Sequence, residues 1–218
     1  MEPDGEARML ENIERIEAHT RAHPELTQSH HFLYDLRVPK GCRGEFVVMG
    51  INPGESPRFC KHYLGPTEET SRFDWIEEAG FDRVEIPWSR WCKFYLDGAP
   101  YVMTELFLWS SRNLRELEVR LGEPLVRSRH HPFCREMNLE LIGAHKPRAV
   151  VVVGLGAALL CCDLYGLRHH GTIRHGGVRV AEQYFDGDGR RWLITKHWTN
   201  GWGLTIGQRD AIRAAIRC

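Results

Sequence analysis

The sequence of 218 residues lacks several features that would assign it to a class of protein at once. No apolar run approaches the roughly 20 residues that a membrane-spanning helix needs. The acidic start, M-E-P-D-G-E, lacks the basic and apolar regions of a signal peptide. The sequence contains no internal repeat and no low-complexity tract. We therefore expect a single globular domain over residues 1–218, a cytoplasmic monomer without a membrane partner.

Paired cysteines are also missing. The seven cysteines are odd in number, scattered and without a C-x-x-C pair, which favours reduced thiols over a disulfide framework. A zinc or iron–sulfur site made from distant cysteines stays open, but the usual ligand spacing is absent. Histidine pairs at 130/131 and 169/170 also suggest a metal, but adjacent histidines point in different directions on regular elements. We expect no metal and no organic cofactor.

The chain has no excess of charge of either sign, with 29 basic and 29 acidic residues. A formal net charge of zero neither supports nor excludes a polyanionic partner, because a local basic patch can still hold one. Most of the basic residues are arginines, which suit bidentate phosphate contacts. A GC-rich coding sequence explains the same bias equally well.

The apolar pattern alternates between strand and helix periods. The predicted strands cover residues 46–51, 101–108, 149–153, 178–185 (at an edge of the sheet) and 192–196, and the predicted helices cover about 6–22, 132–145, 154–165 and 205–217. A long stretch, about 55–100, is dense in Pro, Gly and aromatic residues and is predicted to be an irregular insertion. This order predicts an α/β protein, a three-layer α/β/α sandwich with a mainly parallel central sheet of about four strands.

Two loops that follow predicted strands carry polar side chains. Asn52 ends the run E-F-V-V-M-G-I-N-P-G, and His197 directly follows the strand at 192–196. Open α/β sheets bind ligands beyond the carboxyl ends of their strands, so both loops should open on one edge. Asn52 and His197 are thus a candidate catalytic pair. An Asn in an N-P-G turn is also ordinary turn chemistry, and a histidine at a strand end can be structural, so both alternatives stay open.

The segment G-I-N-P-G, residues Gly50 to Gly54, resembles the first motif of the uracil-DNA glycosylase superfamily. It has the Asn-Pro form used by mismatch-specific and single-strand-selective members. Residues 133–157 resemble the superfamily's helix, Lys-Pro, apolar strand and Gly-x-Gly/Ala turn, and His197 occupies the place of the histidine in the second motif. The resemblance extends from Phe46 to the C-terminus.

This resemblance implies a monofunctional DNA glycosylase of base excision repair. It would flip a deaminated or damaged base out of single- or double-stranded DNA and hydrolyse its N-glycosidic bond. Asn52 would position the attacking water, and His197 would stabilise the departing base. The residues implied for the base pocket are Ile51, Pro53, Gly54, Glu55, Ser56, Phe59 and Glu105. Those implied for a DNA-contacting loop are Lys196, Trp198, Thr199, Asn200 and Trp202.

The chain departs from the superfamily pattern at two places. The second motif continues His-Trp-Thr-Asn instead of His-Pro-Ser, and Glu105 stands where many relatives have an Asn that reads uracil. An ionised Glu105 accepts hydrogen bonds only, whereas a protonated one, its pKa raised by burial, could donate to a base carbonyl. Trp198 and Trp202 either stack on a base or pack the final helix. A non-catalytic protein that binds nucleobases or nucleic acid on the same scaffold is the alternative function.

Overall fold

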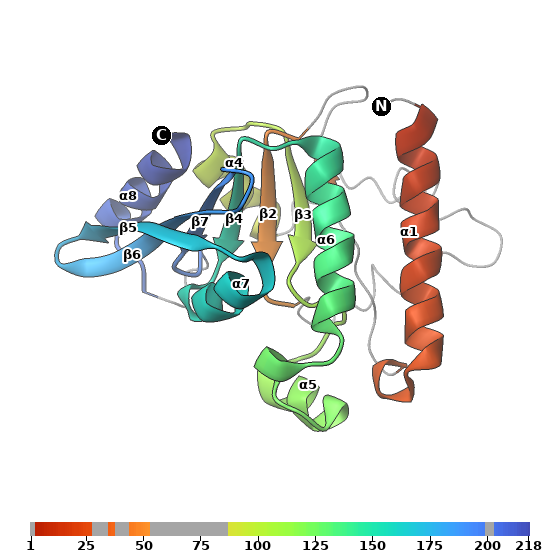
Figure 1. Ribbon diagram of the computed structural model, residues 1–218. Coiled ribbons are helices and arrows are strands. Elements are labelled where there is room, and N and C mark those ends of the chain that lie inside the picture. The colour runs from red at the N-terminus through yellow and green to blue at the C-terminus, as the bar shows by residue number, and fades with distance from the viewer. Residues whose placement is uncertain (1–2, 28–34, 38–43, 53–86, 199–202) are drawn as a thin grey trace.

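The computed structural model describes residues 3–27, 35–37, 44–52, 87–198 and 203–218 (Figure 1). Its strands are β1 (Asp35–Arg37), β2 (Phe46–Gly50), β3 (Tyr101–Glu105), β4 (Ala149–Val153), β5 (Arg168–His175), β6 (Val178–Phe185) and β7 (Arg191–Thr195). Its α-helices are α1 (Pro3–Ala22), α4 (Pro87–Leu96), α5 (Leu114–Leu121), α6 (His131–His145), α7 (Ala158–Tyr165) and α8 (Ile206–Arg217). Short 3₁₀ turns are η1 (Pro24–Leu26), η2 (Leu125–Arg127) and η3 (Leu155–Ala157).

The strands form one mixed sheet in the order β1-β3-β2-β4-β7-β6-β5. The four central strands, β3, β2, β4 and β7, are mutually parallel, and the strands on both flanks are antiparallel to their neighbours. The described part of the sheet therefore has seven strands, more than the about four that the sequence predicted. The α/β class and the parallel centre are confirmed.

Helices cover both faces of the sheet (Figure 1). Successive strand residues point to opposite faces, so Phe46 and Val48 pack with α4 and α8, whereas Val47 and Met49 pack with α6 and α7. The central strands are buried on both faces, which explains their near-continuous apolar runs, such as A-V-V-V-V in β4.

Several elements with weak sequence patterns differ from the sequence prediction. The stretch 55–100 is not irregular throughout, because α4 occupies its end and buries Cys92 and Tyr95. Strand β6 is not an edge strand, because β5 pairs along its outer side. No residue of β5 is buried, so the apolar alternation that would reveal a strand is absent. Strand β5 and helix α5 were both missing from the sequence prediction.

Helix α1 packs beside α6 and contributes to a third apolar cluster (Figure 1). Ile16 is fully buried there with Trp109, and Arg15 forms ion pairs with Glu136 and Glu140 of α6. These contacts attach helix α1 to the sheet. No helix among the described residues is long and apolar enough to cross a membrane.

Candidate functional site

The register of the parallel strands aligns the loops that carry the predicted residues. Gly50 of β2 lies opposite Glu105 of β3, and Val153 of β4 lies opposite Thr195 of β7. Asn52 follows Gly50 by two residues, just as His197 follows Thr195, so both residues lie beyond the same edge of the sheet. Only β4 separates their strands, which corresponds to two strand spacings, or about 10 Å.

The side chain of Asn52 is held by a serine that sequence reasoning missed. Asn52 Nδ2 donates a hydrogen bond to Ser111 Oγ at 2.9 Å, and Ser111 Oγ donates to the Asn113 carbonyl at 3.0 Å. Asn113 is in turn the N-cap of α5, where its side chain accepts from the Glu116 backbone N–H at 3.0 Å. Because the Nδ2 atom of Asn52 is directed at Ser111, the Oδ1 atom, which accepts hydrogen bonds, lies on the other branch of the amide group.

Glu105 is a buried carboxyl group at the end of β3. The side chain is 7% exposed, and its Oε2 has no hydrogen-bond partner among the residues that the structure describes. Burial raises the pKa of Glu105 to about 8, because the ionised form would lose its hydration. The group is therefore predominantly protonated at neutral pH and has an O–H to donate.

Gly50 makes room for this carboxyl group. A Cβ atom built on Gly50 would lie 2.8 Å from Cδ and 2.9 Å from Oε1 of Glu105, and closer still to Oε2. Any side chain at position 50 would therefore collide with the carboxyl group in its present position. The absence of a side chain at Gly50 thus leaves room for the Glu105 carboxyl group at its present position.

The end of β3 is anchored to α6 by a buried asparagine. Asn138 Oδ1 accepts from Thr104 Oγ1 at 2.7 Å, while its Nδ2 donates to the Glu105 carbonyl at 2.9 Å and to Tyr165 Oη at 3.2 Å. Asn138 is 1% exposed, so these bonds are shielded from water. A buried and well-connected network of this kind rigidifies the strand end that presents Glu105.

The described part of the second predicted loop has two half-buried residues, Lys196 and His197, and one buried residue, Trp198. Burial lowers the pKa of His197, which favours the neutral imidazole. Trp198 is fully buried, stacks on Tyr95 with ring centroids 4.5 Å apart, and donates from Nε1 to Thr195 Oγ1 at 2.9 Å. Its ring therefore packs in the core beneath α4 and α8, and this position cannot contact DNA. Lys196 is half-buried, and its backbone N–H donates to the Val180 carbonyl at 2.8 Å.

The structure places the remaining predicted residues only in part. Ile51 is half-buried at the site, and its Cδ1 would lie 3.2 Å from a Cβ built on Gly154. This short distance explains the glycine at position 154, because a side chain there would press against Ile51, the residue that follows β2. The predicted residues outside the described part of the chain are Pro53, Gly54, Glu55, Ser56, Phe59, Thr199, Asn200 and Trp202.

Comparisons with known proteins do not assign the chain to a family. No family model matches it, and a search of curated proteins gave no match. An inference of function therefore depends on the chemistry of the sheet edge that carries Asn52, Ser111 and Glu105.

Proposed function

We propose that this protein is a monofunctional DNA glycosylase with the uracil-DNA glycosylase fold. It would hydrolyse the N-glycosidic bond of a deaminated base after the base is flipped out of the DNA. The observation that carries this proposal is the pairing, on adjacent strand ends, of an oriented Asn52 amide with an uncharged Glu105 carboxyl group.

Asn52 would act by placing the nucleophile. Its amide is too weak a base to remove a proton from water, but Oδ1 has two lone pairs and can accept a hydrogen bond from a water molecule. That water would attack the sugar carbon as the bond to the base breaks and the electron pair leaves with the base. Ser111 supports this role because it fixes the amide orientation from the opposite side. Correct placement of reacting groups contributes several kcal/mol to catalysis.

Glu105 would read the edge of the flipped base. A protonated carboxyl group offers one donor and one acceptor side by side. Deamination creates the complementary arrangement, a carbonyl group next to a ring N–H, in uracil and in hypoxanthine alike. The raised pKa thus favours the donor form of Glu105 over the acceptor-only form that would reject a carbonyl. His197, kept neutral by burial, would donate to the second carbonyl that uracil has, as negative charge develops on the leaving base.

The experiment that tests the proposal measures base release from oligonucleotides. The substrates are single- and double-stranded DNA with uracil, hypoxanthine, xanthine or a T:G mismatch, and abasic products are detected by alkaline cleavage. We expect release of at least one deaminated base, and loss of release in Asn52→Ala with DNA binding retained in a gel shift. Asn12→Ala, the same change on α1, is the matched control. Binding of DNA without release of any base would contradict the proposal and favour the non-catalytic alternative.

A further inference from the structure

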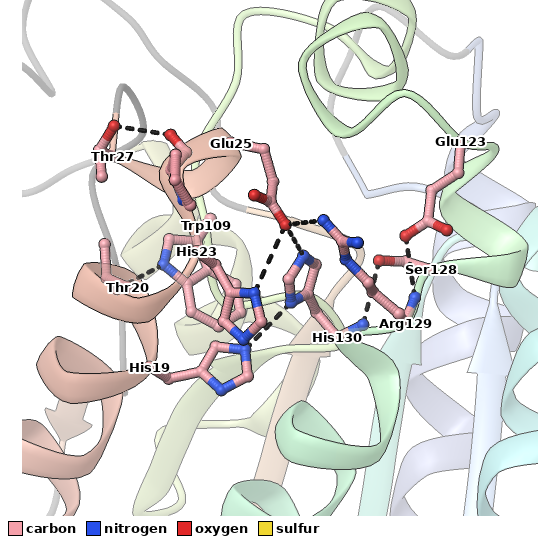
Figure 2. Close-up of polar contacts among 11 residues, drawn as sticks. His19, Thr20, His23, Glu25, Thr27, Trp109, Glu123, Ser128, Arg129 and His130 are labelled. Atoms are coloured by element: carbon pink, nitrogen blue, oxygen red, sulfur yellow. Dashed lines mark hydrogen bonds and ion pairs between the residues drawn. The ribbon is translucent and has the colours of Figure 1, made fainter.

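Three histidine side chains meet between α1 and the start of α6, outside the candidate glycosylase site (Figure 2). His19 lies on α1, His23 directly follows that helix, and His130 directly precedes α6. One ring nitrogen from each lies within 4.8 Å of the other two, and His19 Nε2 is 3.0 Å from His130 Nδ1. We call these three residues the histidine cluster.

The sequence explains how two of these rings come together. His19 and His23 are four residues apart, which places them on one face of a helical turn. The last turn closes at His23, whose N–H donates to the Thr20 carbonyl at 3.2 Å and whose own backbone is extended. The packing of α1 through buried Ile16 then brings this face against His130, which is 1% exposed.

A carboxylate supports the cluster from outside. Glu25 Oε1 lies 3.1 Å from His130 Nε2 and 3.6 Å from His23 Nδ1, and the same carboxylate pairs with Arg129. A proton held on His130 Nε2 by Glu25 leaves the Nδ1 lone pair directed at His19. Figure 2 shows the His23 ring between Glu25 and the His19 ring, so its second nitrogen faces His19.

Aromatic side chains fix the orientation of His19. Its ring stacks on Phe133 with centroids 4.1 Å apart and lies 5.4 Å from the ring of Trp109. Trp109 is held in place by a hydrogen bond from its Nε1 to Thr20 Oγ1 at 2.9 Å. The ring that contributes the Nε2 atom is therefore positioned before any ligand binds.

Three ring nitrogens that converge on one point favour a positively charged ligand at that point. A proton on His19 Nε2 can satisfy the lone pair of His130, but the same proton cannot also satisfy that of His23. A single divalent cation would satisfy all three nitrogens at once.

We propose that His19, His23 and His130 bind one divalent transition-metal ion, with Zn²⁺ as the best match, and that Glu25 is the outer partner of two of the three ligands. Neutral imidazole suits zinc, and tetrahedral Zn–N bonds of about 2.0–2.1 Å place the nitrogens roughly 3.3 Å apart. The observed 3.0 Å between His19 and His130 is close to that spacing. Carboxylates behind metal-bound histidines are a regular feature of such sites. The ion would hold α1 against the start of α6 and leave a fourth position for water.

The test uses the full-length protein, stripped with EDTA and titrated with Co²⁺ as a coloured substitute for Zn²⁺. We expect one equivalent of Co²⁺ to give the strong visible absorption of a tetrahedral site, and Zn²⁺ to displace it. His130→Ala should abolish this absorption, and Glu25→Gln should weaken binding about tenfold to 100-fold. His170→Ala, which removes an exposed histidine of β5, is the control and should leave the titration unchanged.

Two results would overturn the proposal. One is a wild-type titration without a one-equivalent tetrahedral spectrum, which would make the cluster a metal-free network of hydrogen bonds. The other is an unchanged spectrum in folded His130→Ala or, if that variant does not fold, equal metal affinity of the wild type and Glu25→Gln. Circular dichroism shows whether the variants fold. These readouts do not depend on glycosylase activity.

Discussion

The replacement of Glu105 by Gln should make the protein's stability less dependent on pH. Gln has nearly the same shape as Glu, so it fits above Gly50, but it cannot ionise. In the wild type, burial raises the pKa of Glu105 to about 8 from the ordinary value of 4.5. The folded protein therefore retains a proton that the unfolded chain releases between these two values.

The sign and size of the effect follow from this difference. A raised carboxyl pKa means that the unfolded state loses its proton first, so rising pH favours unfolding across the window from pH 4.5 to about 8. Each pH unit in the window costs about 1.4 kcal/mol. Between pH 5 and pH 8, the wild type should therefore lose about 3 to 4 kcal/mol of unfolding free energy relative to Glu105→Gln. The pH dependence of stability that other groups contribute should be the same in both proteins.

The assay is urea unfolding of both proteins at several values between pH 5 and pH 8, followed by tryptophan fluorescence. Glu14→Gln makes the same chemical change on the exposed side of α1 and is the control. Its stability should follow the wild type at every pH. If the curves of the wild type and Glu105→Gln run parallel within about 0.5 kcal/mol, Glu105 is not the neutral acid described here.

Three further changes test the packing that positions the site. Gly50→Ala should displace the Glu105 carboxyl group and lower the free energy of unfolding by about 1–3 kcal/mol. Adding Glu105→Ala to this variant should recover part of the loss. Urea unfolding of the two single variants and the double variant measures this coupling. Asn138→Ala leaves the Thr104 hydroxyl and the Glu105 carbonyl without their buried partner, so thermal unfolding should show a loss of about 2–4 kcal/mol. Trp198→Ala should destabilise the fold by about 3–5 kcal/mol, measured in urea; an unchanged stability with weakened DNA binding would instead support a DNA contact.

Much of the fold could be predicted because its centre depends on local pattern. The valine-rich runs of β2 and β4 are buried on both faces, and the continuous apolar signal follows directly from that burial. Strand β5 could not be predicted in this way, because none of its residues is buried. It forms a strand because it pairs with β6. Helix α5 did have a local signal, an Asn113 N-cap three residues before Glu116.

The site was predictable only in its strand-end residues. Asn52 and Glu105 stand next to buried strands, so topology alone places them at one edge. Ser111 contacts Asn52 from 59 residues away, and the local sequence carries no sign of that contact. The histidine cluster had a partial signal in the four-residue spacing of His19 and His23, while the third member, His130, becomes a neighbour only through the packing of α1 on α6.

In the proposed function, Asn52 positions a water molecule for the cleavage of an N-glycosidic bond. Single-turnover release of a deaminated base from an oligonucleotide, with enzyme in excess, measures that step apart from binding. We expect a rate at least about 100-fold lower in Asn52→Ala than in the wild type or the control Asn12→Ala, at equal DNA affinity. Equal rates in all three proteins would contradict the assigned role of Asn52, and the absence of release from every substrate would contradict the glycosylase itself.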